Sequence, residues 1–330
     1  MKKKVTKLIA ALLAMLMIVS LVACAKKPDE ELEINVYLLN GTTALGASKM
    51  IADEKADVDS MNYKFEIFAA ADAITGAIIS GEADIAALPT NVAAKLYKKS
   101  EGKIQLLALN TLGVLHLLQN GGEPINELSD LKGRTVYLPG AGSNPEFITA
   151  ALLESAGIKV GDDVKLDTTS FNSPDALAAA IASGAADLAV LPEPKVTVTM
   201  MNNTNVTKAL DFSAEWEKLN GENTLVQGCL VVNTEFAKNH PKELEQFLED
   251  YTASVDFIKA GSDEAVQMIV DAGILPKAPI AKKALPNCNL CSITGADMEP
   301  LMKVFYEKLY ACDPASVGAV PDSDFYYVAK

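Results

Sequence analysis

The stretch Ala73–Pro89, AITGAIISGEADIAALP, occurs twice in this chain, and its second copy is Ala176–Pro192, ALAAAIASGAADLAVLP. Each copy combines an Ala-rich helical pattern with a Ser-Gly pair, a short apolar run and a closing Pro. Glycine can take the left-handed conformation that ends helices, and Pro interrupts a strand. Each copy therefore predicts a helix, a turn and a short strand. The residues that recur 103 positions later are Ala73, Ala77, Ile78, Ser80, Gly81, Ala83, Asp84, Ala86, Leu88 and Pro89.

A similar pair of segments opens each half of the chain. Val36-Tyr37-Leu38 leads into the polar loop Asn40–Thr43, and Val136-Tyr137-Leu138 leads into Gly140–Asn144. Two matched segments in the same order indicate two α/β lobes of one design. The alternative is that Ser-Gly-x-Ala-Asp is only a common turn between a helix and a strand. Alternating strand and helix patterns predict parallel-type sheets with helices on both faces.

The alternation breaks near residues 110–113, where the expected strands Ile104–Leu109 and Val114–Leu118 follow each other without a helix. We place the first crossing between the lobes here and the return crossing near residues 227–230. The first lobe then comprises residues 33–112 and 231–330, and the second comprises residues 113–230. One helix is expected at Ala44–Glu54, and the C-terminal region is expected to be helical at Pro241–Ala260, Asp263–Ala272, Ala278–Ala284 and Ala296–Tyr310.

The N-terminus has the pattern of an export signal. Basic residues precede an apolar run from Leu8 to Val22, which is short for a transmembrane helix, and Leu21-Val22-Ala23-Cys24 ends it. Residues 1–23 are therefore predicted to be a signal peptide. A Cys after Leu-Val-Ala resembles the bacterial lipoprotein box, so we expect Cys24 to be lipidated and residues 24–32 to be a tether. The alternative is an ordinary signal peptide with an incidental Cys.

Charge limits the classes of partner. Without residues 1–23 the chain has 25 basic and 43 acidic residues, a net charge of −18. A strongly acidic exported chain is not expected to bind nucleic acid, and no basic stripe contradicts this. About half of the residues are hydrophobic, but no further long apolar run follows the leader.

The expected ligand site consists of four loops: Asn40–Thr43, Pro89–Asn91, Gly140–Asn144 and Pro192–Pro194. In parallel α/β sheets, ligands bind outside the carboxyl ends of the strands, where loops lead into helix N-termini. Gly140–Asn144 stands out, because two glycines allow close backbone approach and a helix N-terminus favours anionic oxygens. It lacks the spacing of a dinucleotide fingerprint or a P-loop, so no nucleotide cofactor is expected. The residues of these loops expected to bind ligand are Asn40, Gly41, Thr42, Thr43, Thr90, Asn91, Gly142, Ser143, Asn144 and Glu193.

Taken together and in order, six features resemble the solute-binding proteins of bacterial ABC importers, in particular the nitrate/sulfonate/taurine family that includes thiamine-precursor binders. The resemblance covers the mature chain. It implies a two-lobed periplasmic-binding-protein-like fold of type II, closing on one small ligand through a double hinge. It also implies an ABC permease as partner, a monomer, and an extracytoplasmic, membrane-anchored location. The features are the lipobox, the tether, SGEADIAALPTN, YLPGAGSNPEFITAALLESAG, SGAADLAVLPEP and GCLVVNTEFAKNHP.

Catalytic and metal chemistry have little support. The two histidines, His116 and His240, lack spaced partners for a triad or a metal site, so structural roles are expected. Cys288 and Cys291 form an isolated C-x-x-C. In an exported protein a disulfide between Cys312 and one of this pair is expected, and a fully reduced set is the alternative.

The sequence therefore predicts a transport binding protein and no enzyme, cofactor or metal. Because the four loops contain no Lys or Arg, the expected ligand is a small organic solute with one sulfonate or carboxylate end, held by dipoles and hydrogen bonds. A neutral heteroaromatic, such as a thiamine-precursor pyrimidine, is the alternative ligand. An enzyme on the same fold and a sensory or adhesive lipoprotein are the alternative classes.

Overall fold

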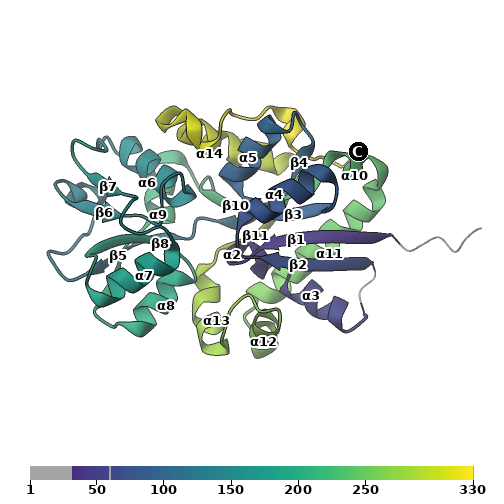
Figure 1. Cartoon of the computed structure of the whole chain (residues 1–330), viewed down its shortest axis with the longest axis horizontal. Coiled ribbons are helices and arrows are strands. Elements are labelled where there is room, and N and C mark those ends of the chain that lie inside the picture. The colour runs from purple at the N-terminus through teal and green to yellow at the C-terminus, as the bar shows by residue number, and fades with distance from the viewer. Residues whose placement is uncertain (1–31, 59–60, 330) are drawn as a thin grey trace, which may run out of the picture. The chain divides into compact units, whose positions relative to one another are not determined.

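The computed structural model describes residues 32–58 and 61–329, so the predicted signal peptide, Cys24 and nearly all of the tether lie outside it. Residues 34–330 are one structural unit. The described strands form two sheets (Figure 1). The first sheet has the order β11 (Leu290–Thr294), β4 (Ile104–Leu112), β10 (Val226–Asn233), β3 (Ile85–Pro89), β1 (Glu33–Leu39) and β2 (Asn62–Phe68). The second has the order β7 (Lys165–Asp167), β6 (Thr135–Tyr137), β8 (Leu188–Pro192), β5 (Leu115–Asn120) and β9 (Val206–Asp211).

The helices follow the strands in chain order. They are α2 (Thr42–Leu45), α3 (Ser48–Lys55), α4 (Ala71–Ser80), α5 (Thr90–Lys99), α6 (Asn144–Ser155), α7 (Pro174–Ser183), α8 (Lys195–Asn202), α9 (Phe212–Asn220), α10 (Thr234–Asn239), α11 (Pro241–Lys259), α12 (Asp263–Asp271), α13 (Ala278–Ala284) and α14 (Met298–Cys312). Short 3-10 turns lie at Leu128–Leu131, Leu285–Asn287, Gly295–Asp297, Pro314–Ser316 and Ser323–Phe325.

Both sheets are mixed rather than purely parallel. β1 is parallel to β3, and β6 is parallel to β7 and β8, as the alternating pattern predicts. In each sheet one strand that arrives from the other sheet is inserted antiparallel: β10 beside β3, and β5 beside β8. The two crossings therefore impose the antiparallel pairs, because each crossing strand starts beside the carboxyl end of its parallel neighbour, with Gly228 opposite Pro89 and Leu115 opposite Pro192.

Each sheet is buried on both faces, as expected of α/β layers. Along β1, Tyr37 belongs to the large core cluster that includes α4 and α5, whereas its neighbours Val36 and Leu38 are buried on the other side. On β5, Leu117 belongs to the same large cluster and Leu118 to a second cluster under α7 and α8. Successive strand residues point to opposite faces, so both faces are covered.

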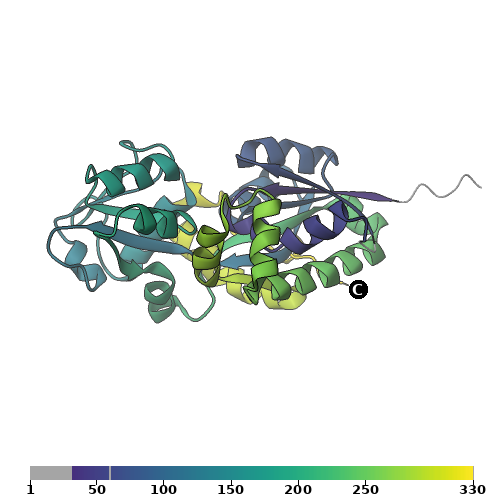
Figure 2. The same ribbon diagram turned by 90° about the horizontal axis from the view of Figure 1, so that it is seen from below.

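The large cluster is continuous between the two sheets. Its members include Leu109 on β4, Leu115 on β5 and Phe147 on α6. Trp216 on α9 lies 5.9 Å from Phe305 on α14, measured between ring centroids. Helix α14 lies between the elements of the two sheets in both views (Figure 1, Figure 2). Apolar contacts therefore accompany the two crossings.

The duplicated sequence forms the same local structure twice. Helices α4 and α7 both end at a left-handed glycine, Gly81 and Gly184, each with φ of 81°. In each copy an asparagine at the end of the antiparallel strand donates its side-chain amide to the last turn of the helix. Asn233 Nδ2 donates to Ile78 O at 2.9 Å, and Asn120 Nδ2 donates to Ile181 O at 2.6 Å. We call these two contacts the amide clamps.

The backbone of each clamp residue is held as well. The N–H of Asn233 donates to Asp84 O, and the N–H of Asn120 donates to Asp187 O, both at 2.9 Å. Asp84 and Asp187 are equivalent residues of the repeat. Asn233 also caps α10, because its Oδ1 accepts from the N–H groups of Glu235 and Phe236. Each clamp asparagine therefore bonds the backbone just before the Ser-Gly-x-Ala-Asp motif and at the Asp that ends it.

Four features differ from the sequence expectation. The helix expected at Ala44–Glu54 is divided into α2 and α3 near Gly46, where the chain approaches α11: Gly46 O accepts from Ser254 Oγ at 2.6 Å, and a Cβ at Gly46 would lie 2.6 Å from Tyr251 Oη. Strand β11 and helix α10 were not expected. β10 pairs with β3 and β4 from Val226 to Asn233, so the return to the first sheet begins slightly earlier than expected.

Removal of a clamp should destabilise the fold. Asn120→Ala removes one of two hydrogen bonds to Ile181 O, whose other donor is Gly184 N at 3.2 Å, and should cost about 0.5–1.5 kcal/mol of unfolding free energy. Asn233→Ala should cost more, because it also removes the cap of α10. Urea unfolding measures both, with the exposed Asn202→Ala as the control, expected within about 0.5 kcal/mol of the unmodified protein. Equal stability of all three variants would show that the clamps contribute nothing.

Candidate ligand-binding site

The loop after β1 is open on one side and anchored on the other. Gly41 has φ of 122°, and a Cβ there would meet no atom within 4 Å. Asn40 is exposed, whereas Thr43 is buried and donates its hydroxyl to Leu39 O at 2.8 Å. The loop is therefore open to a ligand at Gly41, although Asn40 N donates to Phe68 O, Gly41 O accepts from Ala44 N and the Thr43 hydroxyl is bonded to its own strand.

Asn110, near the end of β4, supports this loop. Its Nδ2 donates to Thr43 O at 3.0 Å, and its Oδ1 accepts from the Thr111 hydroxyl at 3.0 Å. Asn110 is 1% exposed, and the neighbouring Tyr251 is buried as well. The sequence signal for this support is a polar pair, Asn110-Thr111, directly after an apolar strand.

The loop after β3 contacts the same region of β10. Thr90 is the first residue of α5 rather than its cap, and its hydroxyl donates to Val226 O at 2.7 Å. The Tyr306 hydroxyl donates to Thr90 O at 2.9 Å. Asn91 is 2% exposed, and its Oδ1 has no hydrogen-bond partner among the described residues. Asn91 is therefore the group of this loop that lacks a structural partner.

Polar groups of the loop before α6 are already hydrogen-bonded to the first turn of that helix. Ser143 is the N-cap of α6, and its Oγ accepts from Glu146 N at 3.4 Å. Glu146 Oε2 accepts from Gly142 N at 2.5 Å, which completes a reciprocal arrangement like a capping box. An anion at this N-terminus would compete with the Glu146 carboxylate. Asn144 Oδ1 is buried without a hydrogen-bond partner among the described residues.

Glu193 lies at the crossing between the sheets. It is 2% exposed, its Oε2 accepts from Thr197 N at 3.1 Å, and a cis peptide bond joins it to Pro194. Burial raises the pKa of the Glu193 carboxyl, although the Thr197 hydrogen bonds and the charge of Lys208 oppose this. Its N–H donates to Val114 O at 3.0 Å.

The crossings gather several of the predicted residues. Val114 N donates to Gln227 Oε1 at 2.6 Å, so the outgoing and returning segments are joined directly. Glu193 contacts the first crossing, and Thr43 and Thr90 contact the start of β10 at the second. The first crossing is also held by Asn289, whose Nδ2 donates to Gly113 O and whose carbonyl accepts from Leu112 N. Sequence reasoning missed Asn110, Gln227 and Asn289.

Helices α5 and α6 meet across the two sheets. The Lys95 Nζ lies 5.1 Å from the centroid of the Phe147 ring. Lys95 follows Asn91 by four residues, and Phe147 follows Asn144 by three, so each pair shares one helix face. Asn91 and Asn144 therefore lie on the helix faces from which this contact between Lys95 and Phe147 is made. Sequence reasoning missed Lys95, because it lies one helical turn beyond the loop.

Two measured cavities lie elsewhere. One of about 210 Å³ is lined by α3 and α11, including Lys49 and Asp250. One of about 750 Å³ lies where β4 begins, and its lining includes Gln105, Lys242 and Tyr327. Neither is lined by any of the ten predicted residues. The site is therefore defined by its unpartnered polar groups and by the open backbone at Gly41 and Gly142.

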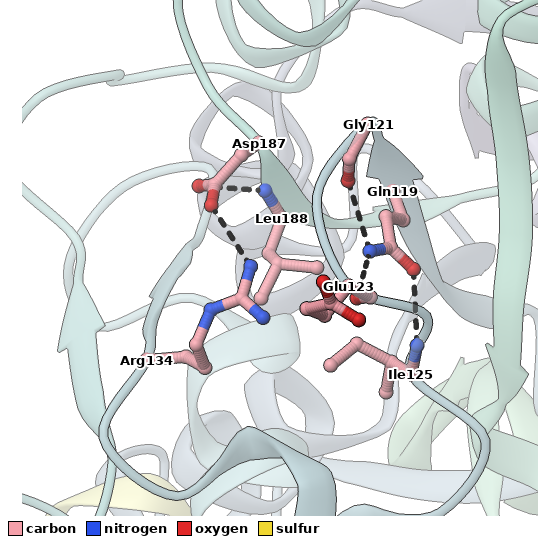
Figure 3. Close-up of polar contacts among 7 residues, drawn as sticks. All are labelled: Gln119, Gly121, Glu123, Ile125, Arg134, Asp187 and Leu188. Atoms are coloured by element: carbon pink, nitrogen blue, oxygen red, sulfur yellow. Dashed lines mark hydrogen bonds and ion pairs between the residues drawn. The ribbon is translucent and has the colours of Figure 1, made fainter.

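The single arginine of the sequence is not at this site (Figure 3). Arg134 lies at the start of β6, and its Nη2 is 3.1 Å from Asp187 Oδ2. His116 is buried on β5, with Nδ1 at 3.8 Å from Asp211 Oδ2, and burial lowers its pKa to about 4. His240 precedes α11 and packs on Phe236. In the described part of the chain, no group of three or more His, Cys, Asp or Glu side chains is placed to hold a metal ion.

The expected disulfide is not formed. Cys229, Cys288, Cys291 and Cys312 are all free thiols. Cys288 Sγ donates to Ala284 O and Cys291 Sγ to Leu109 O, so both sulfurs are engaged with buried backbone. Burial raises the pKa of Cys291 and Cys312 to about 12. These thiols are protonated at neutral pH and are not reactive nucleophiles. Within residues 32–58 and 61–329, no helix is long and apolar enough to cross a bilayer.

This architecture, with two mixed sheets joined by two crossings and polar loops gathered there, is the periplasmic-binding-protein fold. Solved structures with this fold are similar over most of the chain. An ABC transporter protein from Parabacteroides distasonis has 21% identity and a TM-score of 0.75, covering 90% of this chain and 99% of its own. The periplasmic aliphatic sulphonate binding protein SsuA from Escherichia coli has 15% identity and a TM-score of 0.73, covering 90% and 92%.

A protein of Candida albicans, CA3427, whose description gives it the generic periplasmic binding protein fold, has 13% identity and a TM-score of 0.60, covering 89% and 93%. A family model described as NMT1/THI5 like matches residues 64–265, more than half of the chain. The chain belongs to this NMT1/THI5-like family. No curated protein matches it. The resemblance inferred from the sequence is confirmed for the family and the fold.

Substitution at Gly228 should disrupt the support of the first loop. A Cβ there would lie 2.5 Å from Asn110 Oδ1 and 2.6 Å from Thr43 Cγ2, so Gly228→Ala should cost about 1–3 kcal/mol of unfolding free energy. The matched change is Gly76→Ala, on the exposed side of α4 with nothing within 4 Å, which should stabilise by about 0.5–1 kcal/mol. Thermal and urea unfolding measure both, and a neutral Gly228→Ala would contradict this packing.

Proposed function

We propose that this protein is the solute-binding component of an ABC importer. The observation that carries the proposal is the convergence of polar groups from both sheets on the two crossings, in a fold shared with transport binding proteins. Asn91 is buried and Asn144 half-buried, and the Oδ1 atom of each is buried without a hydrogen-bond partner among the described residues, which is costly unless a ligand or water satisfies it. We propose a binding protein rather than an enzyme, because neither histidine lies with a nucleophile and a base in hydrogen-bond reach.

The ligand that we propose is a small organic solute with one sulfonate or carboxylate end. The N-termini of α5 and α6 face the site with partial positive charge. The Ser143 hydroxyl accepts from Glu146 N, so its proton remains available to a ligand oxygen. The aliphatic sulphonate binding function stated for the E. coli neighbour is compatible with this solute class. We propose that Asn40, Gly41, Thr42, Asn91, Gly142, Ser143 and Asn144 contact the ligand, and that Thr43, Thr90 and Glu193 hold the site.

One observation favours the second candidate, a neutral heteroaromatic. Glu146 already accepts from Gly142 N, and Glu193 is a buried carboxyl at the crossing. Two acidic groups beside a site disfavour an anion and favour a ligand with N–H donors. Phe68 lies next to the first loop, since its carbonyl accepts from Asn40 N at 2.8 Å, and it offers a ring that the loops themselves lack.

We propose that the chain works as two lobes, residues 33–112 with 231–330 and residues 113–230. Residues 226–230, at the end of that second range, pair within the first sheet as part of β10, so we propose that they move with the first lobe and that the return hinge lies just before Val226. Leu112–Val114 forms the outgoing hinge. Closure changes few backbone dihedrals at such crossings. The side chains of Gln227 and Asn289 bond the hinge backbone and set its resting angle.

Calorimetry against alkanesulfonates, carboxylates and pyrimidines tests the ligand class. We expect a sulfonate or carboxylate to bind and Ser143→Ala to weaken it by roughly 10- to 150-fold, the equivalent of about 1.5–3 kcal/mol for a charge-assisted hydrogen bond. Ser143→Gly is the matched control for the loss of helix capping. Gly keeps most of the N-cap preference, but like Ala it lacks the hydroxyl. Glu146→Gln should strengthen anion binding, since a competing charge is removed.

The same complexes test closure. Small-angle scattering should give a smaller radius of gyration with bound ligand than without it. Selective binding of a neutral pyrimidine that is indifferent to Ser143 would support the second candidate instead. Absence of compaction with a tightly bound ligand would contradict the hinge. Permease and ATPase genes beside this one would separate transport from the enzyme and the sensory or adhesive alternatives.

We further propose that the protein is exported, acts as a monomer and is anchored on the extracytoplasmic face of the membrane by lipidated Cys24. The basic and apolar leader and the Leu-Val-Ala-Cys sequence support this. Mass spectrometry of protein extracted from membranes should find Cys24 as a diacylglyceryl-modified N-terminus. Normal processing and membrane retention of Cys24→Ala would contradict the anchor, and Cys229→Ala is the control for loss of an unrelated thiol.

A further inference from the structure

Positive charge near the candidate site is scarce. Arg134 pairs with Asp187, and Lys195, the lysine that follows Pro194, pairs with Asp175. Lys208 lies near Glu193 and His116, on the second sheet. Lys95, like Lys208, takes part in no ion pair among the described residues, but its ammonium lies over an aromatic ring, that of Phe147.

The position of Lys95 connects both sides of the site. It lies on α5, one turn beyond Asn91, and its ammonium rests over the Phe147 ring of α6, one turn beyond Asn144. Side chains on a helix lean toward its N-terminus, which for α5 is the end that carries Asn91. A small rotation of the flexible lysine stem therefore moves the ammonium from the ring toward the space between the two amides.

Among the described residues, no carboxylate forms an ion pair with the Lys95 ammonium. Burial lowers the pKa of its ammonium, and only the more distant charge of Asp313 opposes this. An aromatic face attracts a cation, but it supplies no hydrogen-bond acceptor of carboxylate strength. Asn91 and Asn144 can each turn an N–H2 group to the same anion, since rotation by half a turn exchanges the amide oxygen and nitrogen.

We propose that Lys95 selects for negative charge in the ligand, with its ammonium leaving the Phe147 ring to pair with an anionic group held between Asn91 and Asn144. This inference rests on the proposed binding function and assigns its charge selectivity to one residue. The competing explanation is that Lys95 only joins α5 to α6, with its stem packed near Gly318.

Calorimetry with two matched ligands separates these explanations. The probes are butanesulfonate and butanesulfonamide, which differ in charge but share the chain and the sulfur centre. The unmodified protein should bind the sulfonate more tightly. Lys95→Gln should weaken sulfonate binding at least 10-fold and change sulfonamide binding less than about 3-fold. Lys95→Arg, which retains the charge and the contact with the ring, should recover most of the sulfonate affinity.

The control is Lys98→Gln, one turn farther along α5, where the ammonium donates to Gly318 O at 2.7 Å and contacts no ring. It should leave the affinities of both probes unchanged. Equal weakening of both probes by Lys95→Gln would show a purely structural role, and no change in either would place Lys95 outside the site. If the unmodified protein prefers the sulfonamide, the anionic ligand class itself fails, whereas unchanged sulfonate preference in Lys95→Gln overturns only the role of Lys95.

Discussion

The backbone between β4 and β5 must leave one sheet and enter the other within two residues, and this constraint organises the molecule. Gly113 and Val114 have no place in either ladder, so side-chain amides satisfy their backbone groups: Asn289 for Gly113 O and Gln227 for Val114 N. Gly113 is also forced by packing, because a Cβ there would lie 2.2 Å from Ser213 Oγ. The crossing therefore has a defined geometry supplied by residues from three distant parts of the chain.

The same constraint explains where the polar groups lie. A strand that crosses between sheets ends its ladder early and leaves polar backbone exposed to neighbouring loops. Thr90 bonds Val226, and Glu193 bonds Val114, so loops from both sheets are tied to the two crossings. Buried polar groups are normally paired. The Oδ1 atoms of Asn91 on α5 and Asn144 on α6 are among the buried side-chain atoms of the described residues that have no hydrogen-bond partner.

The distribution of charged side chains also affects which ligands this arrangement favours. The chain is strongly acidic, and several of its lysines pair with carboxylates at the surface, as in Lys282 with Asp263 and Lys218 with Glu215. Exposed pairs of this kind contribute little to stability and nothing to a ligand. A partly buried ammonium over a ring, at the junction of α5 and α6, is therefore unusual in this protein. The neighbouring Glu146 has the opposite effect on an anion, so selectivity depends on the balance between the two.

Much of the fold follows from the sequence alone. The repeated Ala-rich segment with Ser-Gly and Asp predicts the two equivalent halves, because helix ends and short strands are encoded by local residues. The order of these elements also predicts which loops lie at the strand ends. The resemblance of the motifs to solute-binding proteins is confirmed for family and fold, whereas the ligand and the site residues stay predictions.

Tertiary structure alone decided the features that depend on distant partners. Strand β11 exists because β4 has a free edge, and α2 and α3 separate near Gly46, where the chain approaches α11. The free thiols of Cys288 and Cys291, the capping role of Glu146 and the position of Lys95 over Phe147 are likewise set by packing. Local sequence determines helices, turns and short strands through backbone preferences, but side-chain partners come from segments brought together only when the chain folds.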